Sequence, residues 1–595
     1  MYNDSYKREI LLTNDHYLVG CTKYSEYPIS LIENSEYWVC IEGKIYGKPD
    51  SVLNNEIFSI LKHVFNGMHR SDRDKKIITD FLLQTDGDFI IYALDKNTKD
   101  FVIMNDALGR LPFYYYKDNE MILASREIQF ISCAIKDNHE NHNIFDKLGM
   151  AQMLLFCYTL GNRTLINNVY RLEPATVLRI YCDSTWLELD TIYRFNFEIK
   201  KYSNVSIEKN AEELVSLFSE ACRNRADYDA KNIVSLSGGL DSRAVAACLH
   251  ENKIPCYAVT STEPHWRPVE GSISETVIAE QIAMSLGMEW ENYGVMKAGA
   301  EDLIMMLKIK KGLTYLGHSF FLRFLEKLNK NYGLKSINFF TGHDGGVVFS
   351  DLSNTITNLD NLDSLARGII YLVGEFRLAE VAALVHIKES EIVDELLNIL
   401  GSYPEENLRQ KLLHYLFFED NAKFTFEIED LSRIYFWTVS PFNSLPFFKY
   451  IINCPDKQKS KYALYREFFF IMSPSVAEIK NSNWGCSISS NKFKIIQSLL
   501  LLYWKYPHLR KIIKKLKDKG SYYPYKYDST VIRCIRDQLY NCTALSKYLS
   551  RKEAEQILNN STDYSHYGFD NLLTVTSLIA NTLCDNKSIE SHFSD

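Results

Sequence analysis

The stretch Asn232-Ile233-Val234-Ser235-Leu236-Ser237-Gly238-Gly239-Leu240-Asp241-Ser242 decides the fold of the chain around it. Residues 232–236 predict a short buried strand, and the next six residues predict a tight glycine turn that opens a helix. Backbone N–H groups at the start of a helix bind phosphate, and adjacent glycines let the backbone approach the anion closely. Two serine hydroxyls add donors, and the Asp241 carboxylate can hold Mg²⁺. The stretch therefore predicts a phosphate-binding loop, although its spacing is not that of a Walker A motif.

After residue 206, short buried strands alternate with helices, which is the pattern of a parallel sheet with βαβ connections. The expected elements are helix 208–224, strand 233–236, helix 242–251, strand 255–260, helix 273–286 and a strand near Trp290. From about residue 365 helices dominate. The sequence therefore predicts an α/β domain with a helical C-terminal part over residues 206–595.

The first 200 residues instead contain short β-type runs separated by turn residues. The runs are 17–21, 37–41, 89–93, 101–105, 121–124 and 176–180. Only residues 55–68 and 146–159 are expected to be helical in this half, which predicts an α+β domain with mostly antiparallel strands. The polar stretch 200–204 is the best boundary, so the expected domains are 1–205 and 206–595.

Composition excludes several functional classes. The 595 residues exceed what one core usually organises, which agrees with two domains. The net charge of -8 makes nucleic acid an unlikely partner. No apolar run is long enough for a membrane span, and no signal peptide is recognisable at the start. The 13 cysteines are scattered, without zinc-ligand spacing, so a reduced, cytoplasmic compartment is expected.

The loop resembles the PP-loop of N-type ATP pyrophosphatases, enzymes that cleave ATP between the α and β phosphates. Motifs in the first half resemble the class II glutamine amidotransferase domain of asparagine synthetases, and further motifs resemble their synthetase domain. The matching segments are 37–47, 86–89, 105–115, 124–127, 163–165, 171–175, 274–287, 440–442 and 461–466. The resemblance implies an Ntn-hydrolase-like sandwich followed by a PP-loop ATP pyrophosphatase domain, with ATP and Mg²⁺ as cofactors.

The resemblance also implies roles for individual residues. Lys461 matches the lysine that neutralises charge during acyl transfer, although a solvated surface lysine is the alternative because Lys457 and Lys459 lie beside it. Asp241 is the expected metal ligand and is counted with Lys461 as catalytic. The expected ATP-binding residues are Leu236, Ser237, Gly238, Gly239, Leu240, Asp241, Ser242, Thr260 and Gly342.

Two departures from the family pattern change the expected activity. Position 2 is Tyr2 where glutamine-hydrolysing members have a nucleophilic cysteine, and Glu42-Gly43 replaces the Asn-Gly that would stabilise an oxyanion. No glutaminase activity is therefore expected. Gly346 stands where the family has its second metal-binding Asp, and Asp344, two residues earlier, is the candidate to reach the same metal.

A PP-loop without the amidotransferase nucleophile resembles lasso-peptide cyclases and β-lactam synthetases. The expected function is activation of a substrate carboxylate as acyl-AMP and its joining to an amine, with macrolactam formation in a precursor peptide favoured. A partner protease or leader-binding protein is then expected. The alternatives are a β-lactam synthetase-like enzyme, an ammonia-dependent asparagine synthase-like enzyme and a catalytically impaired scaffold; an RNA-modifying ATPase is disfavoured.

Three weaker candidates remain. Glu275 and Glu280 follow the second strand and could contact metal or substrate, or could form an exposed helix face. His343 could act in proton transfer, although a hydrogen-bonded loop histidine is the commoner case. The basic run at 510–519 predicts an amphipathic helix that could dock an acidic peptide or form a solvated face.

Overall fold

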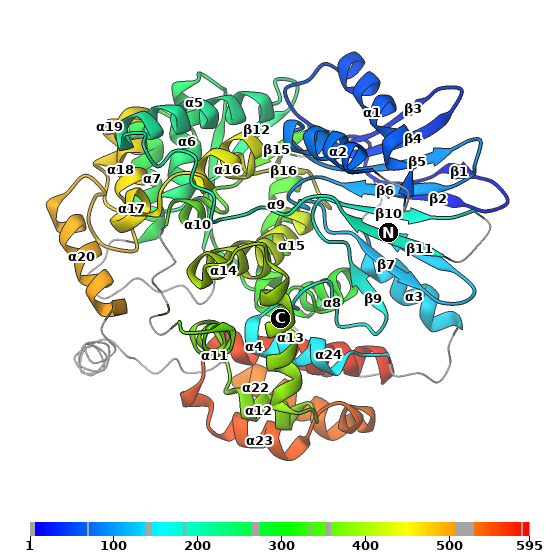
Figure 1. The fold of residues 1–595 in the computed structure, drawn as a ribbon. Helices are drawn as coiled ribbons and strands as arrows, with labels where there is room; N and C mark the ends of the chain where they lie inside the picture. Colours follow the sequence, from blue (N-terminus) through cyan, green and yellow to red (C-terminus); the bar gives the residue numbers. More distant parts are fainter. Residues whose placement is uncertain are drawn as a thin grey trace.

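The computed structural model describes residues 6–67, 71–138, 144–182, 186–262, 274–332, 336–350, 356, 359–505, 529–584 and 587–593, with the backbone alone for 136–138, 501–505 and 529. In Figure 1 the N-terminal sheets occupy the upper right, the parallel sheet and its helices the upper left, and the last helices the bottom. None of the described helices is long and apolar enough to cross a bilayer.

The first domain is built on a six-stranded antiparallel sheet with the order β11-β10-β6-β5-β4-β3. Its strands are β3 Ile29–Glu33, β4 Tyr37–Ile45, β5 Gly87–Asp95, β6 Phe101–Asn105, β10 Thr176–Ile180 and β11 Leu187–Thr191. Two smaller sheets pair β1 Lys7–Thr13 with β2 Leu18–Lys23, and β7 Tyr114–Lys117 with β8 Ile122–Ser125 and β9 Val169–Arg171. The predicted α+β domain is confirmed.

Both faces of this sheet are buried, and alternation along β4 shows how. Val39 and Ile41 pack into the core under helices α1 (Asp50–Val64) and α2 (Asp72–Gln84), whereas Trp38 and Cys40 belong to the core shared with the second domain. One face of the sheet is therefore covered by helices α1 and α2, and the other face is covered by the second domain.

Two helices of this domain were missed by the sequence patterns, so the expectation of only two helices was wrong. Helix α2 begins at a capping box formed by Ser71 and Asp74, but its short apolar stripe lies among charged residues. Helix α3 (Ile128–Asn138) is rich in isoleucine, which also suits strands. The expected helix 55–68 runs from Asp50 to Val64, and 146–159 is α4, Lys147–Phe156.

The second domain contains the predicted parallel sheet, with the order β14-β13-β12-β15-β16. Its strands are β12 Lys231–Ser235, β13 Tyr257–Thr262, β14 Trp290–Val295, β15 Ile337–Phe340 and β16 Trp437–Val439. Helices α5 Ile207–Arg225, α6 Asp241–Glu251 and α7 Glu275–Ser285 accompany it. Strands β13 and β14 lie on one side of β12, and β15 and β16 lie on the other, so the carboxyl end of β12 is the switch point where α/β sheets bind ligands.

Helices form the rest of the described chain, as predicted. Before and after β15 they are α8 Ala300–Lys310, η2 Leu316–Ser319, α9 Phe320–Tyr332, α10 Gly345–Phe349, α11 Leu362–Val373, α12 Leu378–Leu384, α13 Glu389–Ser402 and α14 Leu408–Tyr415. They continue as the π-helix η4 Leu416–Asn421, α15 Ala422–Ser432, η5 Pro441–Asn443, α16 Leu445–Ile452, α17 Asp456–Lys459, η6 Ser460–Tyr462, α18 Ala463–Met472, α19 Pro474–Ala477 and α20 Asn491–Lys505. The last are α22 Ser529–Asn541, η7 Thr543–Lys547, α23 Arg551–Asn559, η8 Ser561–Asp563, α24 His566–Leu583 and α25 Ser588–Phe593.

The proposed boundary at residue 205 does not separate the packing completely. Helix α4 precedes it in the chain, yet its side chains join the core formed by α11, α12, α13 and α24 (Figure 1). The first domain thus contributes helix α4 to the core of the helical part.

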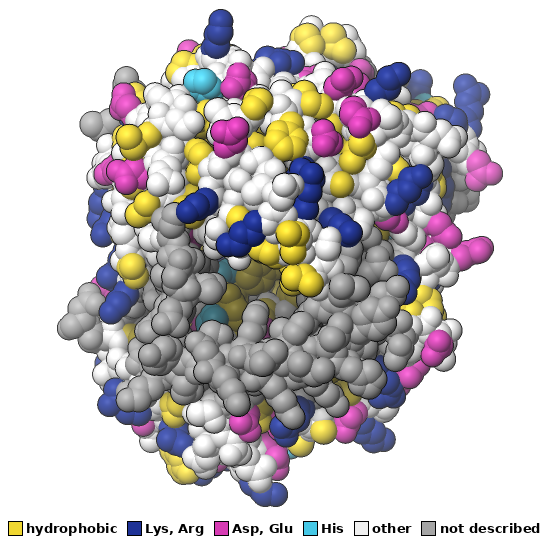
Figure 2. Space-filling model, turned by 90° about the vertical axis from the view of Figure 1, so that its left-hand side faces the viewer, with side chains coloured by type: hydrophobic (Ala, Val, Ile, Leu, Met, Phe, Trp, Pro, Cys, Tyr) yellow, Lys and Arg dark blue, Asp and Glu magenta, His cyan; other side chains and the backbone are white. Residues whose placement is uncertain are grey.

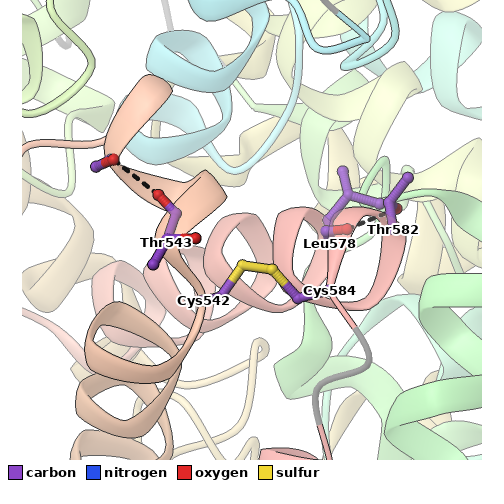
Figure 3. The surroundings of a disulfide bond; sticks show 6 residues. Cys542, Thr543, Leu578, Thr582 and Cys584 are labelled. Carbon is purple, nitrogen blue, oxygen red and sulfur yellow. Dashed lines mark hydrogen bonds between the residues drawn. A yellow bond between two sulfur atoms is a disulfide. The ribbon is translucent and has the colours of Figure 1, made fainter. Parts of the chain in front are cut away.

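A disulfide joins Cys542, just after α22, to Cys584, at the end of α24 (Figure 3). The sequence analysis expected reduced cysteines throughout. The two residues are 42 positions apart and have no recognisable spacing, so only the packing of α22 against α24 brings the C-terminal ends of these helices together.

The two domains meet across a set of buried ion pairs centred on α15. Arg110 of the first domain, fully buried, lies 3.1 Å from Asp88 and 2.6 Å from Glu429. Arg433 follows one helical turn later and reaches the same Asp88 at 3.2 Å. Burial opposes the charge of Arg110, but the two carboxylates outweigh it and raise its pKa. We call Asp88, Arg110, Glu429 and Arg433 the junction network.

We expect Arg110→Ala to destabilise the protein by about 3–5 kcal/mol, because it leaves buried carboxylates without a partner. The midpoint of thermal unfolding, measured by calorimetry, checks this. The matched control is Arg367→Ala, which removes an exposed pair with Asp363 and should change stability by less than about 1 kcal/mol. Equal midpoints for the two variants would show that the junction network contributes nothing.

Candidate functional site

The predicted loop connects the central strand β12 to α6 and is held by its own serines. The Ser242 hydroxyl accepts from the backbone N–H of Ser237 at 2.9 Å and lies 2.9 Å from the Ser237 hydroxyl. The Ser237 hydroxyl in turn accepts from the N–H of Gly239 at 3.2 Å. These bonds fold the loop over the start of α6, where backbone N–H groups gather.

Leu236 and Thr260 support the loop from below. The Thr260 hydroxyl donates to the carbonyl of Leu236 at 2.7 Å and accepts from the indole N–H of Trp290 at 2.8 Å. Gly342, at the end of β15, touches the start of α6 so closely that a Cβ there would lie 2.3 Å from the Ser242 nitrogen. Gly342 therefore sets the distance between strand and helix.

A buried arginine ties a distant segment to the loop. Arg243, in the first turn of α6, donates to the carbonyls of Gly238, Ile479 and Lys480 at 3.2, 2.7 and 2.8 Å. The N–H of Ser482 also donates to the carbonyl of Gly238, at 3.2 Å. Because Trp484 comes two residues after Ser482, these bonds bring it to the pocket beside the loop.

The loop borders a cavity of about 300 Å³ at the carboxyl end of the sheet. Its lining is Ser235, Ser237, Gly239, Leu240, Asp241, Ser242, Thr341, Gly342, His343, Gly346, Tyr462, Tyr465, Asn483 and Trp484. We call it the synthetase pocket. Six of the nine expected ATP-binding residues line it; the other three, Leu236, Gly238 and Thr260, lie behind the loop. Figure 2 shows a hollow in one face of the molecule, with hydrophobic and histidine side chains at its base.

Asp241 begins α6 and has two donors. The Tyr465 hydroxyl donates to Oδ1 and the backbone N–H of Gly346 donates to Oδ2, both at 2.8 Å. Burial raises the pKa of Asp241 to about 6, although these two hydrogen bonds oppose the shift. Gly346, where the sequence suggested a missing metal ligand, thus contacts Asp241 through its backbone.

Asp344 is buried near Asp241, in the left-handed conformation with φ 74°. Its two oxygens accept hydrogen bonds from the amides of Asn421 and Asn443. Burial and the charge of Glu429 raise its pKa. Among the residues that the structure describes, no group of three or more His, Cys, Asp or Glu side chains could hold a metal. The role of Asp344 as a metal ligand stays a prediction.

Lys461 is exposed and does not line the synthetase pocket. It and Tyr462 both have left-handed backbone conformations, with φ 57° and 58°. The ring of Tyr462 lines the pocket in its place. The catalytic role of Lys461 also stays a prediction, because it needs the side chain to turn toward the pocket.

His343 lines the pocket and has a defined partner. Its Nδ1 lies 3.1 Å from Oε1 of Glu429, a residue of the junction network. The same Glu429 oxygen accepts from the hydroxyl of Thr341 at 3.1 Å. Burial opposes ionisation of Glu429, but Arg110 and His343 outweigh it and lower its pKa. An ionised Glu429 therefore orients the imidazole.

The other weak candidates have different outcomes. Glu275 starts α7 beside the loop, since a Cβ on Gly238 would lie 3.2 Å from its Cα. Glu280 is exposed. The basic run 510–519 lies outside the described residues. Sequence reasoning assigned no role to Tyr465, Asn483 or Trp484. Tyr465 lies within the matched segment 461–466, but nothing in the sequence marks the other two.

In the first domain, Glu42 is locked into a polar cluster. Its Oε1 accepts from Tyr27 at 2.6 Å and from Arg126 at 3.1 Å, and its Oε2 accepts from Tyr92 at 2.7 Å. Arg126 also contacts Asp430 of α15. The carboxylate that replaces the expected asparagine is thus neutralised by a structural partner.

Comparison with known proteins gives two domain matches. A family model of glutamine amidotransferase domains matches residues 18–189, and a model of asparagine synthases matches residues 213–316. A protein of Methanocaldococcus jannaschii named putative glutamine-hydrolyzing asparagine synthetase 2 is 26% identical over 211 residues, 34% of this chain and 40% of that protein. The match thus spans less than half the length of that relative.

Two solved structures cover more of the chain at very low similarity. Glutamine phosphoribosylpyrophosphate amidotransferase from B. subtilis, complexed with ADP and GMP, is 9% identical with a TM-score of 0.18, covering 66% of this chain and 80% of that one. A structure of the allosteric regulatory enzyme of purine biosynthesis is 8% identical with a TM-score of 0.17, covering 65% and 76%. Scores this low carry no argument.

The order of the two domain matches agrees with the order of the two folds, and the second match contains the loop that borders the synthetase pocket. Residues 18–189 thus match an amidotransferase domain and residues 213–316 an asparagine synthase domain, which supports an asparagine synthetase-like protein with an amidotransferase-like N-terminal domain.

Proposed function

We propose that the protein is an ATP-dependent carbon–nitrogen ligase, which activates a substrate carboxylate as acyl-AMP, releases pyrophosphate and joins the acyl group to an amine. The observation that carries the proposal is the placement of Ser237 to Ser242 between the central strand and α6, facing a cavity at the switch point of the sheet. The match of residues 213–316 to the asparagine synthase model supports ATP as the nucleotide.

The residues of the loop have defined tasks in this reaction. Backbone N–H groups at the start of α6 bind the phosphates, and the aromatic residues Tyr462, Tyr465 and Trp484 also line the pocket. Mg²⁺ commonly binds through one or two carboxylates together with substrate phosphates, so Asp241 fits it. When bound, the ion supplies positive charge that neutralises the departing pyrophosphate.

His343 is suited to accept a proton from the attacking amine. Glu429 holds its Nδ1, which directs the other ring nitrogen away from that carboxylate, and the side chain is 36% exposed. An amine loses a proton as it attacks an acyl-adenylate, and the imidazole can take it.

The attacking amine is proposed to come from the substrate, because the first domain lacks the amidotransferase nucleophile and holds Glu42 in a polar cluster. Macrolactam formation in a precursor peptide, in the cytoplasm and with a partner protease or leader-binding protein, is the favoured case. A β-lactam synthetase-like or ammonia-dependent reaction uses the same groups. The impaired-scaffold alternative is favoured by one observation, the exposed position of Lys461.

We expect ATP–pyrophosphate exchange with a suitable carboxylate, and a loss of about 100-fold or more in Asp241→Asn, because the site loses its metal-binding charge. Radiolabelled pyrophosphate incorporation, with a panel of amino acids and acidic peptides, measures it. The control Asp229→Asn changes an exposed turn and should keep full exchange. Absence of exchange with every carboxylate would favour the scaffold.

His343→Gln should separate the two half-reactions. Amide formation should fall by roughly 100-fold or more, the usual contribution of a general base, while ATP–pyrophosphate exchange should change much less. Mass spectrometry of the product and the exchange assay, run on the same preparation, give the two rates. An equal loss in both assays would instead assign His343 to nucleotide binding.

Glutamine should not be hydrolysed. Because Tyr2 replaces the nucleophilic cysteine and Glu42 fills the oxyanion position, we expect no glutamate release above the rate without protein. An enzyme-coupled glutamate assay, with and without ATP, checks this. Release that disappears after thiol alkylation would show that another cysteine serves as nucleophile.

A further inference from the structure

A fully buried arginine beside the phosphate-binding loop has no counter-charge. Arg243 lies in the first turn of α6, and its side chain is shielded from solvent. Its guanidinium donates only to backbone carbonyls, those of Gly238, Val476, Ile479 and Lys480. Within the described chain its Nε has no hydrogen-bond partner, and no carboxylate forms an ion pair with it. The positive charge is therefore solvated by carbonyl dipoles alone.

Other buried arginines of this protein show the usual arrangement. Arg110 lies between two carboxylates of the junction network, and both terminal nitrogens of Arg225 contact Asp86, at 2.7 and 2.9 Å. These carboxylates raise the pKa of both arginines, whereas burial lowers the pKa of Arg243 to about 10, which still leaves it charged at neutral pH. A buried charge without a partner is costly. The missing anion at Arg243 is thus expected to come from a ligand.

Arg243 also decides which way one peptide group of the loop faces. The Gly238 carbonyl accepts from Arg243 and from the N–H of Ser482, both at 3.2 Å. In a trans peptide the C=O and N–H point in opposite directions, so the N–H of Gly239 points away from the guanidinium. Gly239 lines the synthetase pocket and Gly238 does not. The peptide therefore presents its donor to the side of the pocket.

This orientation needs to be held, because two adjacent glycines can rotate the peptide between them at little steric cost. A rotated peptide would turn the Gly238 oxygen toward the phosphates and repel them. The N–H of Gly239 now has only the Ser237 hydroxyl as acceptor, at 3.2 Å, which is long for such a bond. A phosphate oxygen can therefore replace that acceptor without loss.

We propose that Arg243 is a positioning residue for the nucleotide: its charge attracts the phosphates, and its bond to the Gly238 carbonyl holds the Gly239 N–H toward them. The phosphates then serve as the counter-charge that the chain does not supply. Because Arg243 also binds the carbonyls of residues 476, 479 and 480, a loaded loop fixes the segment that carries Asn483 and Trp484 to the pocket. The inference rests on the proposed function for the identity of the ligand, ATP.

Equilibrium dialysis of the full-length protein with radiolabelled pyrophosphate, at constant Mg²⁺, and with radiolabelled adenosine tests the charge. Arg243→Gln keeps an amide donor but removes the charge, so it should raise the Kd of pyrophosphate about tenfold or more and leave that of adenosine unchanged. Arg243→Lys restores the charge and should recover most of the pyrophosphate affinity. The control Arg223→Gln removes the same charge at an exposed position of α5 and should change neither Kd.

Unchanged pyrophosphate binding in Arg243→Gln, an equal loss for both ligands, or no recovery with lysine would overturn the inference. If the melting curve shows that the variants do not fold, hydrogen exchange of the unmodified protein decides. Pyrophosphate should slow exchange in residues 476–482 as well as in 237–243, and protection of the loop alone would contradict the link through Arg243.

The two proposals can fail separately. Pyrophosphate binding that follows the charge at position 243, without ATP–pyrophosphate exchange for any carboxylate, would contradict the proposed function alone. Exchange in the unmodified protein, together with an unchanged pyrophosphate Kd in Arg243→Gln, would contradict the role of Arg243 alone.

Discussion

The rest of the structure depends on the burial of two guanidinium groups, Arg110 and Arg433, between two acidic residues. Charges that leave water at this depth require partners on every side, and here the partners come from different domains: Asp88 from the first and Glu429 from α15. The position of α15 is therefore fixed by electrostatics as well as by packing. Apolar side chains at such a junction could pack in several relative positions of the two domains. The buried ion pairs form in only one of them.

The fixed position of α15 also determines how residues of the synthetase pocket are held. Glu429, held by Arg110, orients His343, and the preceding π-helix presents Asn421 to Asp344. π-Helices often occur at functional sites because the extra residue redirects side chains. One helix thus connects the domain junction and the synthetase pocket.

The sequence predicted what depends on neighbouring residues and missed what depends on distant ones. The β12–loop–α6 unit and the parallel strands were predictable because glycines, serines and apolar runs act locally. Thr341, Tyr465 and Trp484 reach the pocket only through tertiary contacts, Trp484 by way of Arg243. Helix α2 was missed because its apolar stripe is short, and the Cys542–Cys584 pair because its spacing carries no signal.

The Glu42 cluster has a consequence for how such proteins can change over time. Its carboxylate neutralises Arg126, which also contacts Asp430 on α15, so an asparagine at position 42 would leave a buried cation short of one partner. A change at this one position of the first domain therefore acts on the second domain through Arg126. Exchanging either half for that of another protein would leave the charges on the two sides of the junction mismatched.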